Sequence, residues 1–172
     1  MTDAVTNLKI INKKDNWMTP KNIYDKLDKI FQFTLDPCPV NPTFDGLHIK
    51  WSGSVFVNPP YSEVEKWVAK AVNEICEGNV ETVVFLVYAK TDTKWFHKYV
   101  WKNKFPFWDI DFIKGRVKFV NPDGLSKNTA PYPSMILIYS RKPKCSRCGS
   151  YNIYIAKNGF ERNECKDCGY AP

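Results

Sequence analysis

The sequence has no apolar run that approaches the roughly 20 residues required by a membrane-spanning helix. Its first 15 residues are polar and of mixed charge, so they lack the apolar core of a secretory signal peptide. Internal repeats and low-complexity stretches are also absent. These absences exclude a protein held by a transmembrane helix, and we expect a soluble, cytoplasmic protein with no membrane partner.

The composition is that of an ordinary globular chain of 172 residues, with 44% apolar and 25% charged residues. It excludes a disordered or collagen-like protein, and the length suits one domain with a small appendage. The net charge of +7 is concentrated in two segments. Residues 90–127 carry nine Lys or Arg against four Asp, and residues 141–172 carry seven against three acidic residues. Two separate basic segments indicate contact surfaces for a polyanion.

Four of the six cysteines form two CxxC pairs, namely Cys145 with Cys148 and Cys165 with Cys168. A short secreted chain could use them as disulfides, but Cys38 and Cys76 stand alone and no secretion signal precedes them. The spacing predicts a tetrahedral zinc site with four thiolate ligands, and a redox pair is the alternative. Gly149 and Gly169 follow the pairs and permit the tight turns that such a site requires.

Strands and helices alternate along the first part of the chain, and strands alone follow. We expect strands at 33–35, 54–57, 82–88, 110–113, 117–120 and 134–140, and helices that begin at Thr19-Pro20, at a capping box of Ser62 and Glu65, and at residue 92, the last ending at 103. This order predicts an α/β fold with a mainly parallel sheet and antiparallel C-terminal strands. Residues 37–53 form a long loop, and long loops in compact domains are usually functional.

The strongest candidate for chemistry is Asn58-Pro59-Pro60-Tyr61, directly after the strand 54–57. Ligands of open α/β sheets bind at the carboxyl ends of strands. Two consecutive prolines make the segment stiff and give it carbonyl acceptors without N–H donors. Together with the Asn58 side chain, these acceptors suit a partner with two N–H bonds, and Tyr61 adds a flat ring. An exocyclic amine on a nucleobase fits; the alternative is a rigid turn with a buried tyrosine.

This motif resembles the catalytic motif of amino-group DNA methyltransferases that use S-adenosylmethionine, and the wider sequence is similar to the phage-type DNA N6-adenine methyltransferase family. The similar segments occur in family order at 17–20, 33–38, 51, 56–61, 91–97, 112–119 and 130–134. They cover most of residues 16–140. The resemblance implies a compact Rossmann-like methyltransferase sheet, with S-adenosylmethionine as methyl donor and DNA as partner.

The resemblance also implies roles for the motif residues. Asn58 and the Pro59 carbonyl accept both hydrogens of the adenine N6, which aims its lone pair at the sulfonium methyl. Pro60 holds the turn rigid, and Tyr61 stacks on a base that has left the duplex. Cytosine N4 presents the same two hydrogens, so it is the nearest alternative substrate.

The methyl-donor site is less clearly marked, because no glycine-rich loop follows the first strand. Asp36 and Pro37 occupy that position, and Asp36 is a candidate for the methionine amino group. Thr19 and Pro20 could frame the pocket, and Asp45 could bind the ribose hydroxyls. The alternative for Asp36 is an Asx-type turn, and the alternative for Thr19 and Pro20 is a helix start.

Lysines recur every four residues at Lys90, Lys94, Lys98 and Lys102, so a helix here carries a basic stripe. Lys114 and Arg116 add charge nearby. We expect Lys94, Lys98, Lys102, Lys114 and Arg116 to contact DNA phosphates, with a solvated helix face as the alternative. His97 is expected to pack or hydrogen-bond, because the implied reaction needs no strong base.

The chain divides into a polar segment at 1–15, a methyltransferase domain at 16–140, and a hinge with a zinc ribbon at 141–172. The ribbon depends on its metal for folding, and it could bind DNA or be purely structural. The resemblance thus implies a DNA adenine-N6 methyltransferase of phage or prophage origin that acts in the bacterial host cytoplasm. The sequence does not determine its oligomeric state, although a monomer is favoured. The alternative from another class is a catalytically inactive, nucleic-acid-binding zinc-ribbon protein.

Overall fold

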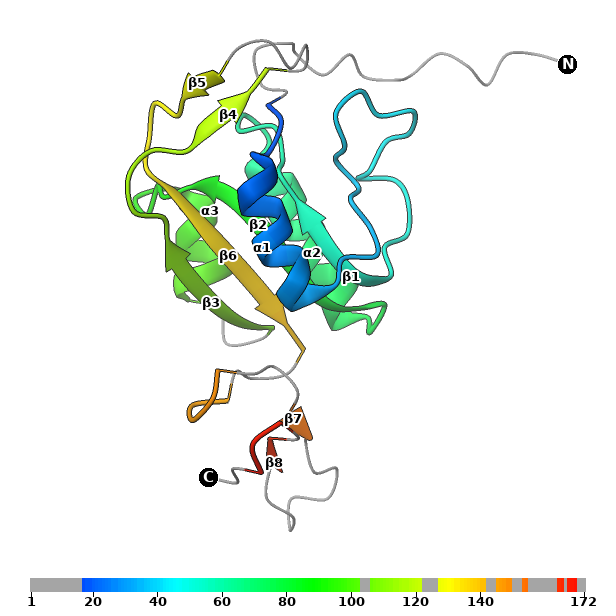
Figure 1. Ribbon diagram of the computed structural model, residues 1–172. Helices are drawn as coiled ribbons and strands as arrows, with labels where there is room; N and C mark the ends of the chain where they lie inside the picture. The colour runs from blue at the N-terminus through cyan, green and yellow to red at the C-terminus, as the bar shows by residue number, and fades with distance from the viewer. Residues whose placement is uncertain are drawn as a thin grey trace, which may run out of the picture.

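The computed structural model describes residues 17–102, 106–121, 127–141, 145–149, 153–154, 164–165 and 167–169. Its centre is a four-stranded sheet in the order β1-β2-β6-β3 (Figure 1). The strands are β1 (Gly53–Val57), β2 (Val80–Tyr88), β6 (Ser134–Ser140) and β3 (Phe107–Phe112). β1 and β2 are parallel, whereas β6 is antiparallel to both β2 and β3.

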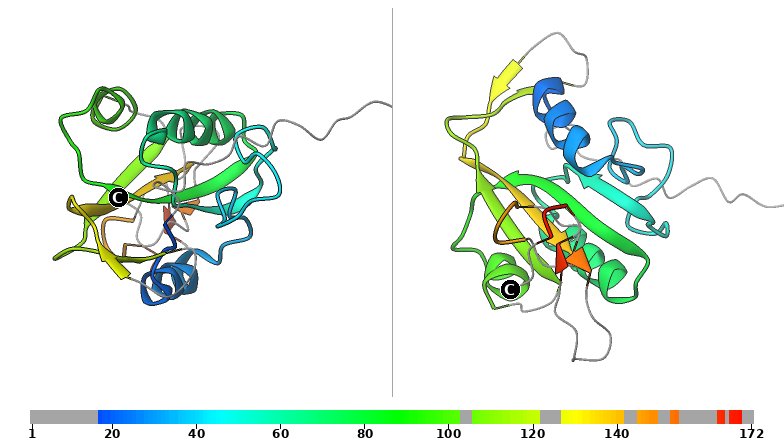
Figure 2. Two further views of the ribbon diagram at one scale, coloured as in Figure 1. Left: turned by 90° about the horizontal axis from the view of Figure 1, so that it is seen from above. Right: turned by 60° about the horizontal axis from the view of Figure 1, so that its bottom comes forward.

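The sheet lies between two layers of helices (Figure 2). α1 (Lys21–Phe31) covers one face, and α2 (Val64–Cys76) and α3 (Lys94–Phe96) cover the other. A π-helical segment, η1 (His97–Trp101), continues α3. Because both faces are covered, β2 is a continuous apolar run rather than an alternating one. Val83 and Phe85 belong to the core beneath α2, and Val84 and Leu86 belong to the core beneath α1.

The predicted strands 54–57, 82–88 and 134–140 are confirmed within two residues. The predicted strand 33–35 is reduced to a single parallel bridge between Leu35 and Val55. The expectation of mainly parallel pairing is wrong, because β6 lies between β2 and β3 and runs opposite to both. β1, β2 and β3 nevertheless share one direction, so their carboxyl ends meet at the same edge.

Two small sheets complete the fold. β4 (Lys118–Val120) pairs with β5 (Lys127–Thr129), which the sequence did not predict, and Met18 bridges to Val120. β7 (Ile153–Tyr154) pairs with β8 (Glu164–Cys165) in the cysteine-rich part. None of the helices in the described parts of the chain is long and apolar enough to cross a membrane.

The helix starts differ from the sequence prediction. α1 has Pro20, not Thr19, at its N-cap. The predicted capping box is wrong: Glu63 is the N-cap of α2 and makes no side-chain cap hydrogen bond. The Glu63 amide instead donates to the Pro60 carbonyl at 2.9 Å, because the chain turns once more after the prolines before the helix begins.

The third helix begins at Lys94 rather than at residue 92 and widens into η1. Phe96 and Val100 are buried on its inner face. The hydroxyl of Tyr139, on β6, donates to the Tyr99 carbonyl at 2.9 Å. This bond fastens the irregular turn to the sheet, and such π-type turns recur at functional sites.

Candidate functional site

The Asn58–Tyr61 turn lies at the carboxyl edge of the central sheet. β1 ends at Val57 and the parallel β2 ends at Tyr88. Ser134, the first residue of β6, is the register partner of Tyr88. Leu35 runs parallel to β1, so Asp36 leaves the sheet at this edge as well. The predicted motif residues and Asp36 are therefore gathered on one side of the molecule.

The side-chain amide of Asn58 is held in one orientation. Its Nδ2 donates to the backbone carbonyl of Trp17 at 2.6 Å. Its Oδ1 is buried and has no hydrogen-bond partner among the described residues. An unpaired buried acceptor costs roughly 1–3 kcal/mol, so Oδ1 is available to a donor from outside the described chain. Local sequence patterns do not predict Trp17 as the anchor, because the two residues are 41 positions apart.

The two prolines are both buried, but their carbonyls differ in use. The Pro60 carbonyl accepts the Glu63 amide and so helps to begin α2. It is therefore engaged within the fold. The assignment of the second acceptor to the Pro59 carbonyl stays a prediction.

Tyr61 belongs to an aromatic cluster. Its ring stacks on Tyr88 with centroids 3.6 Å apart and planes inclined by 9°, and the Phe119 ring approaches at 5.9 Å in an edge-on arrangement. Tyr88 contacts Tyr132 at 5.4 Å, and the Lys90 ammonium lies 3.8 Å from the centre of the Tyr132 ring. One face of Tyr61 is therefore covered by Tyr88.

Asp36 has the perturbed electrostatics expected of a binding residue. Burial raises the pKa of its carboxyl to about 6, although the Cys38 amide donates to Oδ1 at 2.9 Å. The predicted Asx turn is thus present, and it leaves the second carboxylate oxygen for another partner. Burial also raises the pKa of the Cys38 thiol to about 12, which makes that cysteine unreactive.

A cavity of about 220 Å3 lies between the loop after Asp36 and the start of α2. Its lining residues are Pro37, Cys38, Pro42, Phe44, Asp45, Gly46, Leu47, His48, Pro60, Glu63, Lys66 and Trp67. A side chain on Gly46 would collide with the Pro37 carbonyl, and the Gly46 carbonyl accepts the Trp51 indole N–H at 2.8 Å. The fully buried Trp51 therefore fixes this long loop against the core.

Two of the five predicted donor-site residues line this cavity, Pro37 and Asp45. The Asp45 carboxylate already has local partners: Oδ1 accepts the Leu47 amide at 2.9 Å and Oδ2 lies 2.8 Å from the His48 ring nitrogen. Thr19, Pro20 and Asp36 are not among the lining residues. The Pro20 carbonyl accepts amides of the first turn of α1, which is the helix-start role.

The predicted nucleic-acid residues divide into two kinds. The side chains of Lys94, Lys98, Lys102 and Lys114 are exposed. Arg116 is also exposed, but its guanidinium is held against the protein, because its Nη1 donates to the Pro131 carbonyl at 2.5 Å. Arg116 therefore braces the loop that carries Tyr132.

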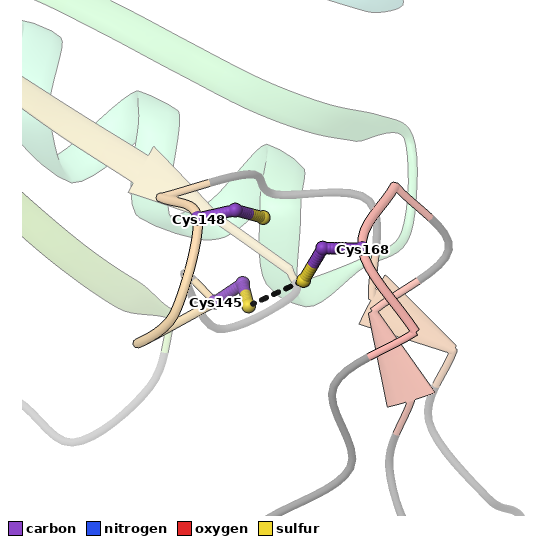
Figure 3. A group of neighbouring side chains, drawn as sticks. All are labelled: Cys145, Cys148 and Cys168. Carbon is purple, nitrogen blue, oxygen red and sulfur yellow. Dashed lines mark hydrogen bonds between the residues drawn. The ribbon is translucent and has the colours of Figure 1, made fainter.

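Three of the four predicted metal ligands lie together (Figure 3). The Sγ atoms of Cys145, Cys148 and Cys168 all lie within 4.8 Å of one another, and those of Cys145 and Cys168 are 3.8 Å apart. Thiolates at about 2.3 Å from a tetrahedral zinc ion lie about 3.8 Å apart, so the spacing fits that metal. Gly149 has a positive φ of 76°, as the tight turn predicts. The side chain of Cys165 lies outside the described residues.

The fold and the site define a mixed α/β domain with an amide and an aromatic ring at the carboxyl edge of its sheet and a separate cysteine cluster. The chain belongs to the DNA N-6-adenine-methyltransferase (Dam) family, whose model matches residues 6–163. The match extends past the central sheet into the cysteine-rich part.

The chain is also similar to the crystal structure of the 23S rRNA methyltransferase ErmE, at 14% sequence identity and a TM-score of 0.38. That similarity covers 71% of this chain and 50% of the other, so this chain spans about half of that methyltransferase. No curated protein matches the sequence.

Proposed function

We propose that the chain transfers a methyl group from S-adenosylmethionine to the N6 amine of adenine in DNA. The observation that carries this proposal is the available acceptor of Asn58. Its Nδ2 is tied to Trp17, and its buried Oδ1 has no partner within the described chain. An amine with two N–H bonds is the ligand that such an acceptor suits, and membership of the Dam family supports adenine as its bearer.

Catalysis then follows from position and electrostatics. Asn58 Oδ1 accepts one N6 hydrogen and the Pro59 carbonyl accepts the other, which draws the nitrogen lone pair out of the ring conjugation. S-adenosylmethionine, when bound, supplies a methyl group made electrophilic by its sulfonium. With the donor bound, the stiff turn would hold the amine in line with that methyl. The N6 nitrogen would gain the methyl as the methyl–sulfur bond breaks, the sulfonium would become a neutral thioether, and the nitrogen would lose one proton to water.

The residues around the site fit the methyl donor. The Asp36 carboxylate, at the strand end, suits the cationic amino group of its methionine part, and the raised pKa reports a carboxylate short of compensating charge. The cavity beside Pro37 and Pro60 adjoins the catalytic turn and has Phe44 and Trp67 in its lining. We assign this cavity to the nucleoside part of the donor.

We further propose that residues 16–140 form the catalytic domain and that 141–172 form a zinc ribbon. The last strand of the central sheet along the chain is β6, which ends at Ser140. The three described cysteine sulfurs have the spacing of a tetrahedral thiolate site. Cys145, Cys148, Cys165 and Cys168 would hold the ion, which serves folding rather than methyl transfer. A phage or prophage origin, with action in a bacterial host, rests on the sequence resemblance.

Nucleoside mass spectrometry tests the proposal and its alternatives together. DNA is incubated with the full chain and a donor that carries a deuterated methyl group, then digested to nucleosides. Labelled N6-methyl-2′-deoxyadenosine is the expected product. Labelled N4-methyl-2′-deoxycytidine in its place would show that cytosine, not adenine, is the substrate. Absence of label, together with no donor binding in a calorimetric titration, would identify an inactive binding protein.

A further inference from the structure

A second aromatic site lies beside the catalytic edge, in a cleft between η1 and β3. The cleft has a volume of about 450 Å3, within the range of roughly 300–1,000 Å3 usual for ligand sites. Its lining residues are Thr91, Phe96, His97, Trp101, Trp108, Asp109, Ile110 and Phe112. Thr91 follows the end of β2 and Phe112 ends β3, so the cleft opens at the same sheet edge as the Asn58 turn.

Two of its aromatic rings are unusually exposed. Trp101 is 67% exposed and Phe112 is 61% exposed, and Ile30 and Tyr132 are the other two large apolar side chains with such exposure in the described part of the chain. Large rings left in water on the wall of one cleft mark an interaction site rather than part of the core. Trp108 and Ile110 pack beneath them against the main core, so the site has a firm floor.

Charge indicates which partner this cleft suits. Lys98 and Lys102 are exposed and stand three residues before and one residue after Trp101 in the sequence, and Lys114 is exposed two residues after Phe112. Asp109 lies in the lining of the cleft itself, and Asp92 and Asp111 are close in the chain, but the surrounding segment 90–127 carries nine basic against four acidic residues. Exposed rings interleaved with cations are the arrangement that binds unpaired nucleic acid, in which bases stack on the rings and phosphates contact the cations.

We propose that this cleft stacks an unpaired base of the DNA substrate, distinct from the target adenine, and that the chain binds locally unpaired DNA more tightly than intact duplex. The inference rests on the proposed function in taking DNA as the substrate. Trp101 and Phe112 supply the stacking faces, and Lys98, Lys102 and Lys114 hold the flanking phosphates. A base in an intact duplex is already stacked and cannot enter.

Equilibrium binding tests the assignment with the full chain and no methyl donor. Three fluorescent DNAs of one sequence are compared: a single strand, a duplex, and a duplex with a short unpaired bubble. The variant Trp101→Ala/Phe112→Ala is expected to lose on the order of tenfold in affinity for the single strand and the bubble. Its affinity for the duplex, and its dependence on salt, should stay near those of the wild type.

Two controls make the test specific. Ile30→Ala removes an equally exposed apolar side chain, 69% exposed, from α1 on the other face of the sheet, and it should leave all affinities unchanged. Trp101→Phe keeps a flat ring and should retain most of the affinity for unpaired DNA, whereas Trp101→Leu should not. Both variants are compared by thermal unfolding, so that a loss of fold is not mistaken for a loss of stacking.

Three results would overturn the proposal. The double variant could bind unpaired DNA like the wild type, or it could lose affinity for the duplex to the same extent. The cleft could also prove to be covered by a second copy, seen as a dimer that the double variant abolishes without any change in DNA binding. Because binding is measured without methyl transfer, failure here is separate from failure of the adenine-N6 assignment, which only the labelled nucleoside reports.

Discussion

The rings of Tyr61 and Tyr88 lie face to face, 3.6 Å apart and inclined by only 9°. That separation is van der Waals contact, so nothing can enter between the rings. A target base that stacks on this face of Tyr61 must first displace Tyr88. The face of Tyr61 toward Tyr88 is therefore closed to a base while the two rings stack.

This relationship predicts different effects at its two members. Tyr61→Ala should weaken capture of the target base, and Tyr61→Phe should be milder because the stacking face survives. Tyr88→Ala should make the base easier to capture, since no ring has to leave. The fluorescence of 2-aminopurine at the target position reports capture directly. Equal loss in Tyr61→Phe and Tyr61→Ala would show that the hydroxyl group matters and the ring face does not.

The variant Asp36→Asn should affect the stability of the fold and the binding of the methyl donor in opposite directions. The pKa of the folded carboxyl is raised from 3.8 to about 6, so its stabilising contribution is complete below pH 3.8 and is lost as the pH rises through 6. This difference in pKa corresponds to roughly 3 kcal/mol of folding stability that is lost at neutral pH, where the carboxyl is ionised. Asparagine can still accept the Cys38 amide but carries no charge. We expect a higher melting temperature at pH 7 together with loss of donor binding; unchanged binding would remove Asp36 from the site.

Donor binding should therefore depend on pH through the same group. Below pH 6 the Asp36 carboxyl of the free protein is protonated and no longer attracts the cationic amino group. The affinity for S-adenosylmethionine should fall about tenfold per pH unit in that range, and the residual affinity of Asp36→Asn should not change. Calorimetric titrations from pH 5 to 8 measure both. A flat profile for the wild-type chain would contradict the assignment.

Metal analysis should find one zinc ion per chain. Cys168→Ser removes a ligand whose Sγ lies 3.8 Å from that of Cys145, and it should lower both the zinc content and the stability of the ribbon. Cys76→Ser is the matched control, because this exposed cysteine lies on α2, away from the cluster. Residues 1–140 should fold without the ribbon. An insoluble truncation would show instead that the ribbon completes the main core.

The exposed lysines should contribute affinity rather than sequence choice, because lysine is a flexible point charge suited to phosphates. Replacing Lys94, Lys98 and Lys102 together by alanine should lower affinity for all sequences alike. The slope of log affinity against log salt should fall by about 0.7 per lysine on a single strand and about 0.9 on a duplex. Arg116→Ala should change that slope less, since its guanidinium holds the Pro131 carbonyl. An unchanged slope in the triple variant would make the stripe a solvated face.

The sequence pattern predicted those elements whose structure depends on residues close together in the chain. The strands β1, β2 and β6 are apolar runs buried on both faces, and the buried stripe of α2 follows helical spacing, so both were visible in the sequence. The position of Asn58 at a strand end and the grouping of the CxxC cysteines were also predictable, because both follow from residues close together in the sequence. The capping box failed because the prolines impose their own turn before α2.

Contacts between distant segments were not predictable. The anchor from Asn58 to Trp17 joins residues 41 positions apart, and the bond from Tyr139 to the Tyr99 carbonyl spans 40. Neither leaves a trace in local periodicity. The π-helical turn that the second bond fastens was therefore read as an ordinary helix. The stack of Tyr61 on Tyr88 likewise depends on two strands meeting at one edge.

The most direct test of the account is the Asn58→Ala variant, measured for methyl transfer to DNA and for binding of S-adenosylmethionine. Asn58 Oδ1 is expected to face the base amine and not the donor, so donor affinity should be nearly unchanged. The rate of methyl transfer should fall on the order of 100-fold or more, as when a charge-stabilising contact is removed. Near-normal methyl transfer by this variant would contradict the proposed chemistry at its centre.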